Sequence, residues 1–541
     1  MRFTFVSRAT AAVAAFFFLC VWHRAAQAQS EPGLEQAIRK VMSRPEFAHS
    51  RFGVSIWSLD TGKPVYELNA QQLFVPGSTT KLLTEGTALE LLGADYRFHT
   101  RVYRAGALKK DGTLDGDLVL VASGDPNLSN RIQADGTLAF EDEDHSYGGA
   151  ESKGLPGDPM VVIRNLARQV AEHGVKRVKG RVVVDASLFP EGQRELGTGV
   201  VISPIVVNDN VIDVIGSPGA TEGAPVTLKI SPQTAYAKFT NQATTGKAGS
   251  RSTLDYTPDT TNPDGTHSVT VTGTLPTGSP AIMASYAVPE PSRFATTVLV
   301  EALRENGVKC AGLATGEKRD FKALSAHYTA ENQMAEHVSP PLQEEIKVTL
   351  KVSQNLHASM TPSLLGALLA RSEKDLQQAG FDLENGFLKK AGVDLTAASQ
   401  SDGAGGDAYF APDFMVHYLM YMSQQKDFGV FKKALPVMGK DGTLVKIQVN
   451  SPAAGHVFAK TGTYIVYDAL NKNLMVTGKG LAGYVETANG QHLVFAAYVN
   501  LVSVPLGESD AIRKIAGEAL GEIASAAYEF GAVAKRASAG E

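Results

Sequence analysis

The interpretation of this sequence is decided by three short stretches: Ser78-Thr79-Thr80-Lys81, Ser353-Gln354-Asn355 and Lys460-Thr461-Gly462-Thr463. Each stretch alone is common and fits an exposed helix turn, a loop cap or a solvated strand end. In this order they supply a nucleophile with an amine base, a polar bridge and a cationic strand edge. Together they predict a serine acyl-transfer site, and the long interval between the first two needs its own explanation.

The first stretch combines a hydroxyl and an amine at the start of a helix that we expect over residues 78–92. Ser78 and Lys81 are three residues apart, so their side chains share one helix face. The N-terminus of the helix also favours negative charge near Ser78. Lys81 can accept a proton only when it is neutral, and a free lysine titrates near about 10.4. Burial or a second cation, for which Lys460 is the candidate, lowers that pKa.

The second stretch supplies two polar groups that an extended loop would point in the same direction. Ser353 can relay a proton between the base and a leaving amine, and Asn355 can hold a substrate amide and fix Lys81. Ser-x-Asn has little value as a signal alone, because turns and caps use the same residues. Its meaning comes from the other two stretches.

The third stretch lies on a predicted strand that follows residues 455–459. We expect Gly462 to let a substrate backbone approach closely, since it has no side chain. Lys460 and the threonine hydroxyls can bind a carboxylate. The N–H of Thr463 can stabilise a developing oxyanion together with the N–H of Ser78, and one such donor is typically worth about 10² to 10³ in rate.

Length and composition describe a folded protein of several domains. The chain has 541 residues, of which 43% are hydrophobic and 20% charged, so we expect two or three domains. A net charge of -5 disfavours a nucleic-acid binder, which would normally carry a basic face. We expect the lone cysteine of the mature chain, Cys310, to be a small buried hydrophobic residue and not a reactive thiol.

The N-terminus has the pattern of a secretory signal peptide over residues 1–28. Arg2 and Arg8 precede an apolar run over 11–22, and Ala26-Gln27-Ala28 is a small-x-small cleavage site. The run is short for a membrane span. Cys20 lacks the small preceding residue that lipid attachment needs. We therefore expect export, which disfavours ATP-driven and nicotinamide chemistry.

The pattern of residue types changes twice along the mature chain. A strand pair over 53–68 and the helix over 78–92 form a first part, 29–95. Short β-type runs rich in Gly, Pro and Thr follow, which predicts an inserted domain over 96–190. A second one, with the return through the first, is expected over 191–285. Helical patterns resume near residue 293, so 286–541 is assigned to the same domain as 29–95.

An acidic run, Glu141-Asp142-Glu143-Asp144-His145, offers potential cation ligands. It lacks the ligand spacing of a calcium-binding loop. We expect a solvated acidic loop and no metal site.

At this point the chain resembles the class C low-molecular-mass penicillin-binding proteins, the D-alanyl-D-alanine carboxypeptidase/endopeptidase family. The resemblance covers nearly all of the mature chain, because further family signatures appear outside the three stretches: Val75-Pro76-Gly77-Ser78, Ala122-Ser123-Gly124-Asp125-Pro126, Val207-Asn208-Asp209-Asn210, Ser401-Asp402-Gly403, Leu435-Pro436-Val437 and Asp441-Gly442-Thr443-Leu444. It implies an α/β (α+β) catalytic domain like that of serine β-lactamases and transpeptidases, with an antiparallel sheet flanked by helices. It also implies two inserted, mainly β domains, which account for the long interval.

The resemblance implies a periplasmic enzyme that cleaves peptidoglycan stem peptides through an acyl-enzyme on Ser78. Lys81 is the implied base, while Ser353 and Lys460 assist proton delivery to the leaving amine. β-Lactams would acylate Ser78 covalently, no metal or organic cofactor is implied, and peripheral membrane association stays open. The remaining motif residues receive substrate-binding roles: Asn355, Thr461, Gly462 and Thr463.

Two alternatives remain at this stage, a β-lactamase or esterase on the same scaffold and a non-catalytic protein that binds peptidoglycan. The first is disfavoured because no Glu-x-x-x-Asn element follows Asn355. The chain departs from the family pattern at Ala404, at Gln354 and His357, and over residues 464–478. None of these positions carries a reacting group, so we expect them to affect loop geometry and substrate preference.

Overall fold

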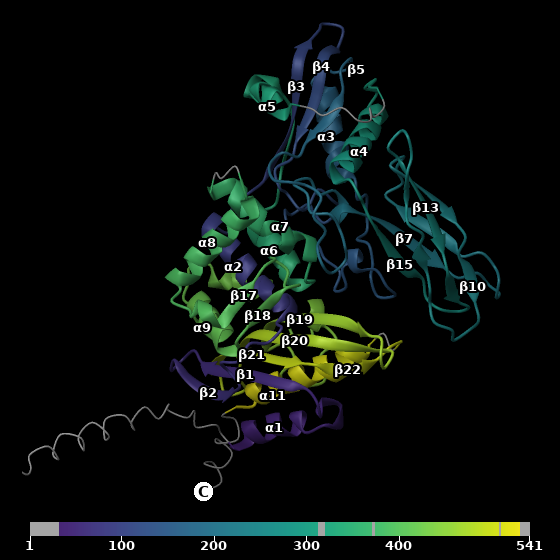
Figure 1. Cartoon of the computed structure of the whole chain (residues 1–541). Coiled ribbons are helices and arrows are strands. Elements are labelled where there is room, and N and C mark those ends of the chain that lie inside the picture. Colours follow the sequence, from purple (N-terminus) through teal and green to yellow (C-terminus); the bar gives the residue numbers. More distant parts are fainter. Residues whose placement is uncertain (1–31, 312–319, 371–373, 508–509, 531–541) are drawn as a thin grey trace, which may run out of the picture.

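The computed structural model describes residues 32–311, 320–370, 374–507 and 510–530 (Figure 1). The predicted signal peptide, 1–28, lies outside these residues. Within the described ranges, no helix combines the length and the apolar character that a membrane span requires.

The N- and C-terminal parts of the chain build one six-stranded antiparallel sheet. Its order is β19-β20-β21-β1-β2, and β22 pairs with β20. The strand pair predicted over 53–68 is confirmed as β1 and β2. The strands are β1 (Arg51–Ser58), β2 (Lys63–Leu68), β19 (Val457–Asp468), β20 (Asn473–Glu486), β21 (His492–Asn500) and β22 (Val502–Pro505).

Helices cover both faces of this sheet, so it is buried from two sides. Alternate residues of β21 enter different cores, as the two-residue period of a strand requires: Val494 and Ala496 pack in one, Phe495 and Ala497 in the other. Figure 1 shows α1 (Pro32–Met42) and α11 (Glu518–Tyr528) on one side and a larger helical group on the other. That group contains α2 (Lys81–Leu92), α6 (Leu342–Lys351), α7 (Asn355–Leu365), α8 (Leu376–Lys390), α9 (Pro412–Met422) and α10 (Phe428–Ala434), with the short hairpin β17 (Ala398–Gln400) and β18 (Ala408–Phe410).

A second sheet with its own helices begins directly after α2. Strand order is β16-β3-β4-β5, and β6 also pairs with β4. Cys310 is partly buried against the core of this unit, as predicted. The elements are β3 (His99–Leu108), β4 (Thr113–Val121), β5 (Arg177–Val178), β6 (Val182–Asp185), β16 (Gln333–Val338), α3 (Val161–Glu172), α4 (Pro291–Glu305) and α5 (Phe321–Leu324).

The regular structure of residues 211–287 consists of short strands joined by loops. They form a sheet of order β15-β7-β8, a small sheet around β13, and the pair β10-β14. A small apolar core that includes Val214, Val271 and Leu275 holds them together. The strands are β7 (Val211–Ser217), β8 (Thr227–Ser231), β9 (Ala237–Asn241), β10 (Thr244–Gly246), β11 (Asp255–Tyr256), β12 (Thr260–Thr261), β13 (His267–Thr272), β14 (Thr274–Pro276) and β15 (Ile282–Ala287).

The strand pairings bear on where the inserted segments end. Strand β16, which we assigned to the second catalytic segment (286–541), pairs with β3 in the second sheet. Helix α4 contributes Phe294 and Leu299 to the same core as that sheet. The division of the chain into domains remains a proposal, and these contacts favour a return to the catalytic domain near residue 338 and not at 286.

Candidate active site

Ser78, the predicted nucleophile, lies on a tight helical turn that leads directly into α2. Residues Gly77–Thr80 form one 3₁₀ turn, and α2 continues from Lys81. Gly77 has a φ of +53°, and a Cβ at this position would lie 2.5 Å from the backbone N of Thr463. Only glycine therefore allows this approach of the turn to β19. Ser78 is partly exposed in this turn, at the N-terminal end of α2.

Lys81 is completely buried, and its Nζ contacts four oxygen atoms. It lies 2.7 Å from Ser78 Oγ, 3.3 Å from Ser353 Oγ, 2.6 Å from Asn355 Oδ1 and 3.4 Å from the carbonyl oxygen of Ala404. None of the four is a carboxylate. Burial lowers the pKa of Lys81 to about 7, against the opposing effect of more distant carboxylates such as Glu195. Lys81 is therefore available as a neutral amine near neutral pH.

Ser353 connects the two motif lysines. Its Oγ accepts a hydrogen bond from Lys460 Nζ at 2.8 Å and lies 3.3 Å from Lys81 Nζ. The backbone of Ser353 has a φ of +63°, a conformation that costs energy for a residue other than glycine. Asn355 begins helix α7. The expectation of an extended loop is therefore wrong: a left-handed residue between α6 and α7 places the two side chains together.

Lys460 is also completely buried, on the strand at the edge of the sheet. Besides Ser353 it donates to the carbonyl oxygen of Thr461 at 2.9 Å. Burial lowers the pKa of Lys460 well below its usual value, and the charges of Lys81 and Lys479 lower it further. The expectation that Lys460 depresses the pKa of Lys81 needs adjustment. Burial has the largest effect on the pKa of Lys81, whereas the positive charge of Lys81 lowers the pKa of Lys460.

Gly462 is required for a different reason from the one we expected. A Cβ on Gly462 would lie 1.9 Å from the carbonyl oxygen of Pro76 and 3.0 Å from the N of Ser78. The backbone that approaches Gly462 is thus the nucleophile turn of this chain, and the glycine sets the position of Ser78. On either side, the hydroxyl of Thr461 donates to Thr443 Oγ1 at 2.8 Å, and that of Thr463 accepts from Lys479 Nζ at 2.7 Å.

Comparison with known proteins assigns nearly the whole chain to one family. The model of the D-Ala-D-Ala carboxypeptidase 3 (S13) family matches residues 34–518. The chain belongs to this family. A D-alanyl-D-alanine carboxypeptidase of Actinomadura sp. (strain R39) is 28% identical over 503 residues, which cover 88% of this chain and 83% of the relative. The carboxypeptidase DacB of Haemophilus influenzae is 23% identical and covers 83% and 85% of the two chains.

A solved structure supports the fold. The crystal structure of penicillin binding protein 4 (dacB) from Haemophilus influenzae has a TM-score of 0.68 at 20% identity, and covers 91% of this chain and 98% of that chain. The predicted α/β fold is therefore confirmed. As an S13 family member the protein is a serine-type D-Ala-D-Ala carboxypeptidase, as the family resemblance implied.

The peptidase anchors its second motif through side chains that lie far away in the sequence. Gln354 is fully buried, and its Nε2 donates to Asp144 Oδ1 at 3.2 Å and to Ser146 Oγ at 3.1 Å. Its Oε1 accepts from the N of Leu356 and so caps α7. The hydroxyl of Tyr147 donates to the carbonyl oxygen of Ser353 at 2.5 Å. The departure from the family pattern at Gln354 is thus a structural anchor.

Only part of the acidic run forms the solvated loop that we expected. Asp144 and His145 are buried. The guanidinium of Arg131 lies between the carboxylates of Asp144 and Asp209 and compensates their charge. Asp209 also accepts from His145 Nε2 and from His357 Nε2, each at 2.7 Å. The pKa of Asp209 is held well below its usual value by Arg131 and both imidazoles, against its burial. Asp144, His145 and Asp209 have the spacing of metal ligands, but Arg131 already supplies the positive charge.

The departure at Ala404 involves a residue that acts through its backbone. Asp402 accepts hydrogen bonds from the N of Ala404 at 2.7 Å and from the N of Gly405 at 2.6 Å. This turn presents the carbonyl oxygen of Ala404 to Lys81. A side-chain hydroxyl at position 404 is therefore not needed for that contact.

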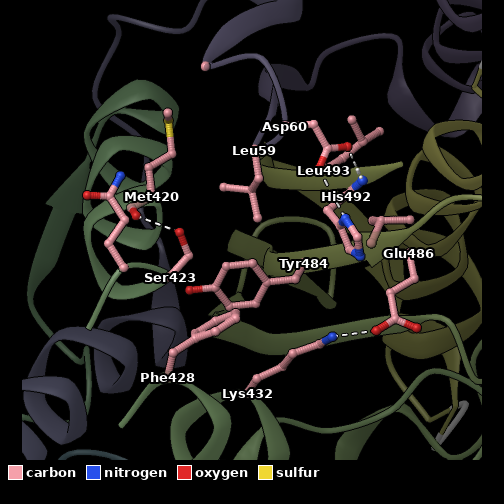
Figure 2. A pocket seen from close by; sticks show the side chains of 13 residues that line it. Leu59, Asp60, Met420, Ser423, Phe428, Lys432, Tyr484, Glu486, His492 and Leu493 are labelled. Carbon is pink, nitrogen blue, oxygen red and sulfur yellow. Dashed lines mark hydrogen bonds and ion pairs between the residues drawn. The ribbon is translucent and has the colours of Figure 1, made fainter. Parts of the chain in front are cut away.

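A separate pocket of 370 Å³ lies over a different part of the sheet and contains no motif residue (Figure 2). Its charged side chains pair with one another: Lys432 with Glu486, and His492 with Asp60. None of the predicted site residues lines this pocket, so it is separate from the lysine–serine cluster.

Proposed function

We propose that the peptidase hydrolyses the D-Ala-D-Ala ends of peptidoglycan stem peptides through an acyl-enzyme on Ser78, with Lys81 as the base. The observation that carries this proposal is the 2.7 Å contact of Ser78 Oγ with the Nζ of a completely buried lysine. A base is most effective when its pKa lies near the working pH. The pKa of Lys81, about 7, meets that condition.

In the proposed reaction, one proton moves from Ser78 through the cluster to the leaving amine, while an ester bond to Ser78 forms and the peptide bond breaks. Lys81 takes the proton of Ser78 as Oγ attacks the carbonyl carbon. The N–H groups of Ser78 and Thr463, on the two segments that Gly77 and Gly462 bring together, stabilise the oxyanion. The proton passes through Ser353, with Lys460 in support, to the departing amine, and the peptide bond breaks. Water then attacks the ester and regenerates the Ser78 hydroxyl.

Substrate binding is assigned to residues around this path. Asn355, whose Oδ1 holds Lys81 at 2.6 Å, has an amide nitrogen that can face a substrate carbonyl. The hydroxyls of Thr461 and Thr463 lie along the strand edge, where a terminal carboxylate would bind. Gly462 keeps this edge against the nucleophile turn.

The same site supports two further proposals. Cleavage of D-alanyl cross-links uses the same chemistry with a larger leaving amine. β-Lactams would acylate Ser78, and a Haemophilus influenzae penicillin binding protein 4 structure contains a bound β-lactam.

The signal pattern over residues 1–28 supports a location in the periplasm.

A substrate assay tests the proposal with both leaving groups. The mature protein is incubated with disaccharide pentapeptide and with cross-linked dimer, and released D-alanine and monomer are quantified. We expect D-alanine release by the wild type and a loss of at least about 10³ in Ser78→Ala and in Lys81→Met. Full activity in either variant would contradict the assigned roles. Rapid turnover of penicillin without peptide cleavage would instead favour a β-lactamase.

A further inference from the structure

A third lysine lies at the active-site edge of the sheet. Lys479 is on β20 directly opposite Thr463 of β19, and its Nζ donates to Thr463 Oγ1 at 2.7 Å. Thr463 is exposed, and its backbone N lies against the turn that carries Ser78. Lys479 therefore reaches the same strand position that the proposed mechanism uses for the oxyanion. Neither the three motifs nor the family signatures in the sequence include it.

Lys479 has no counter-ion among the described residues. Among the residues that the structure describes, no carboxylate lies within ion-pair distance of its Nζ, and Thr463 is its hydrogen-bond partner. The side chain is only partly exposed. A cation withdrawn from water without an anion is costly, so such groups are usually paired or bind a charged ligand. Burial lowers the pKa of Lys479 to about 8, which leaves it mostly protonated at pH 7.

We propose that Lys479, together with the hydroxyl of Thr463, binds a carboxylate of the substrate. This inference rests on the proposed function and assigns to that reaction a specificity-determining residue. An ammonium group with three donors can keep its contact to Thr463 Oγ1 and donate to a carboxylate oxygen at the same time. The hydroxyl of Thr463 then donates its own hydrogen to the bound anion.

Carboxylates occur both at the end of a stem peptide and on its acyl-donating half, and both can come near this strand edge. Thr461 and Thr463 are two residues apart, which is about 7 Å along a strand. Thr461 follows Lys460, whose Nζ contacts Ser353 on the path to the leaving amine. Thr463 lies further along the edge, on the side of the oxyanion. Because the proposed function also places Thr463 beside the terminal carboxylate, Lys479 can reach either that carboxylate or one on the acyl-donating half of the substrate.

The test uses three D-alanyl thioesters that share one scaffold: a neutral probe, a probe with a carboxylate on the leaving thiol, and a probe with a carboxylate on the acyl substituent. Wild type, Lys479→Met and Lys479→Arg are compared by kcat/KM. The readout is the preference ratio of each charged probe over the neutral one. We expect Lys479→Met to lower one ratio about 10- to 100-fold, the range of a charge-assisted hydrogen bond. The loss should fall mainly on KM, and Lys479→Arg should recover part of it.

Controls separate binding from folding and from the proposed reaction itself. Lys472→Met changes an exposed lysine in the turn of the same hairpin and should leave both ratios unchanged. A lower ratio for the acyl-side probe assigns the carboxylate to the acyl donor, and a lower ratio for the other probe assigns it to the leaving group. Unchanged ratios in Lys479→Met would overturn the inference. If the wild type cleaves none of the probes, the proposed function fails, and not only the role of Lys479.

Discussion

The Nζ of Lys81 lies 2.7 Å from the Oγ of Ser78, and in the part of the chain that the structure describes no carboxylate contacts this lysine. A carboxylate in contact would keep Lys81 protonated and unable to accept a proton. The site instead surrounds the amine with hydroxyl, amide and carbonyl oxygens. This relationship makes a lysine able to act as a base.

The rate of acylation should depend on pH through this group. Because burial lowers the pKa of Lys81 to about 7, the neutral, active amine dominates above that pH and is lost as the pH falls. We expect kcat/KM for a D-Ala-D-Ala substrate to fall roughly tenfold per unit below about pH 6. Because Lys460 lies close by, this fall of kcat/KM at low pH reports the coupled titration of both lysines. A rate that stays constant between pH 5 and pH 8 would contradict a lysine base.

Removal of the Ser353 hydroxyl should break the link between the two lysines. Ser353→Gly is the informative change, because glycine adopts the φ of +63° without strain, which offsets part of the cost of the lost hydrogen bonds and should leave the protein folded. We expect kcat to fall about 10² to 10⁴-fold, the usual contribution of a positioned proton-transfer group. Steady-state kinetics and a thermal melt check the two statements. Near-normal kcat in a folded variant would remove Ser353 from the proton path.

A methyl group on Gly462 should displace the nucleophile. The added Cβ would lie 1.9 Å from the carbonyl oxygen of Pro76, so the turn that carries Ser78 must move. We expect Gly462→Ala to lower kcat/KM at least about 10²-fold, since a shift of this size removes the aligned geometry. Gly386→Ala is the matched control: nothing lies within 4 Å of its Cβ, and in α8 it should stabilise by about 0.4–1 kcal/mol. Equal kinetics for the two variants would refute the packing argument.

Replacement of Arg131 should destabilise the peptidase far more than replacement of a surface arginine. Arg131→Met leaves the buried carboxylates of Asp144 and Asp209 without their guanidinium, which typically costs about 3–5 kcal/mol. Arg168, exposed and paired with Glu172 one helical turn away, provides the control, with an expected cost below about 1 kcal/mol. Urea unfolding of both variants measures the difference. Similar losses in the two would show that the network contributes little to stability.

Much of the site could be predicted from the sequence because its chemistry lies in short local patterns. The helical spacing of Ser78 and Lys81 brings their side chains together whatever the rest of the fold does. Lys460 and Thr461 are adjacent on a segment that was predicted to be a strand and is one. The interval between the first two motifs indicated inserted domains through its β-type texture.

Other features depend on contacts that no local pattern records. Gln354 is 210 residues away in sequence from Asp144, so its role as an anchor became visible only in the fold. The same holds for the buried ion pairs within the acidic run, which looks like a solvated loop when read alone. Gly462 shows a subtler limit: the need for glycine was predicted, but the close approach of the Pro76 backbone, which also requires it, could not be read from the sequence.

The central claim is that Ser78 forms the acyl-enzyme, and intact-protein mass spectrometry after benzylpenicillin treatment tests it most directly. We predict a stable mass increase of one penicillin in the wild type, located by peptide mapping to Ser78, and no adduct in folded Ser78→Ala. An adduct that persists in Ser78→Ala, or its absence from folded wild-type protein, would contradict the account.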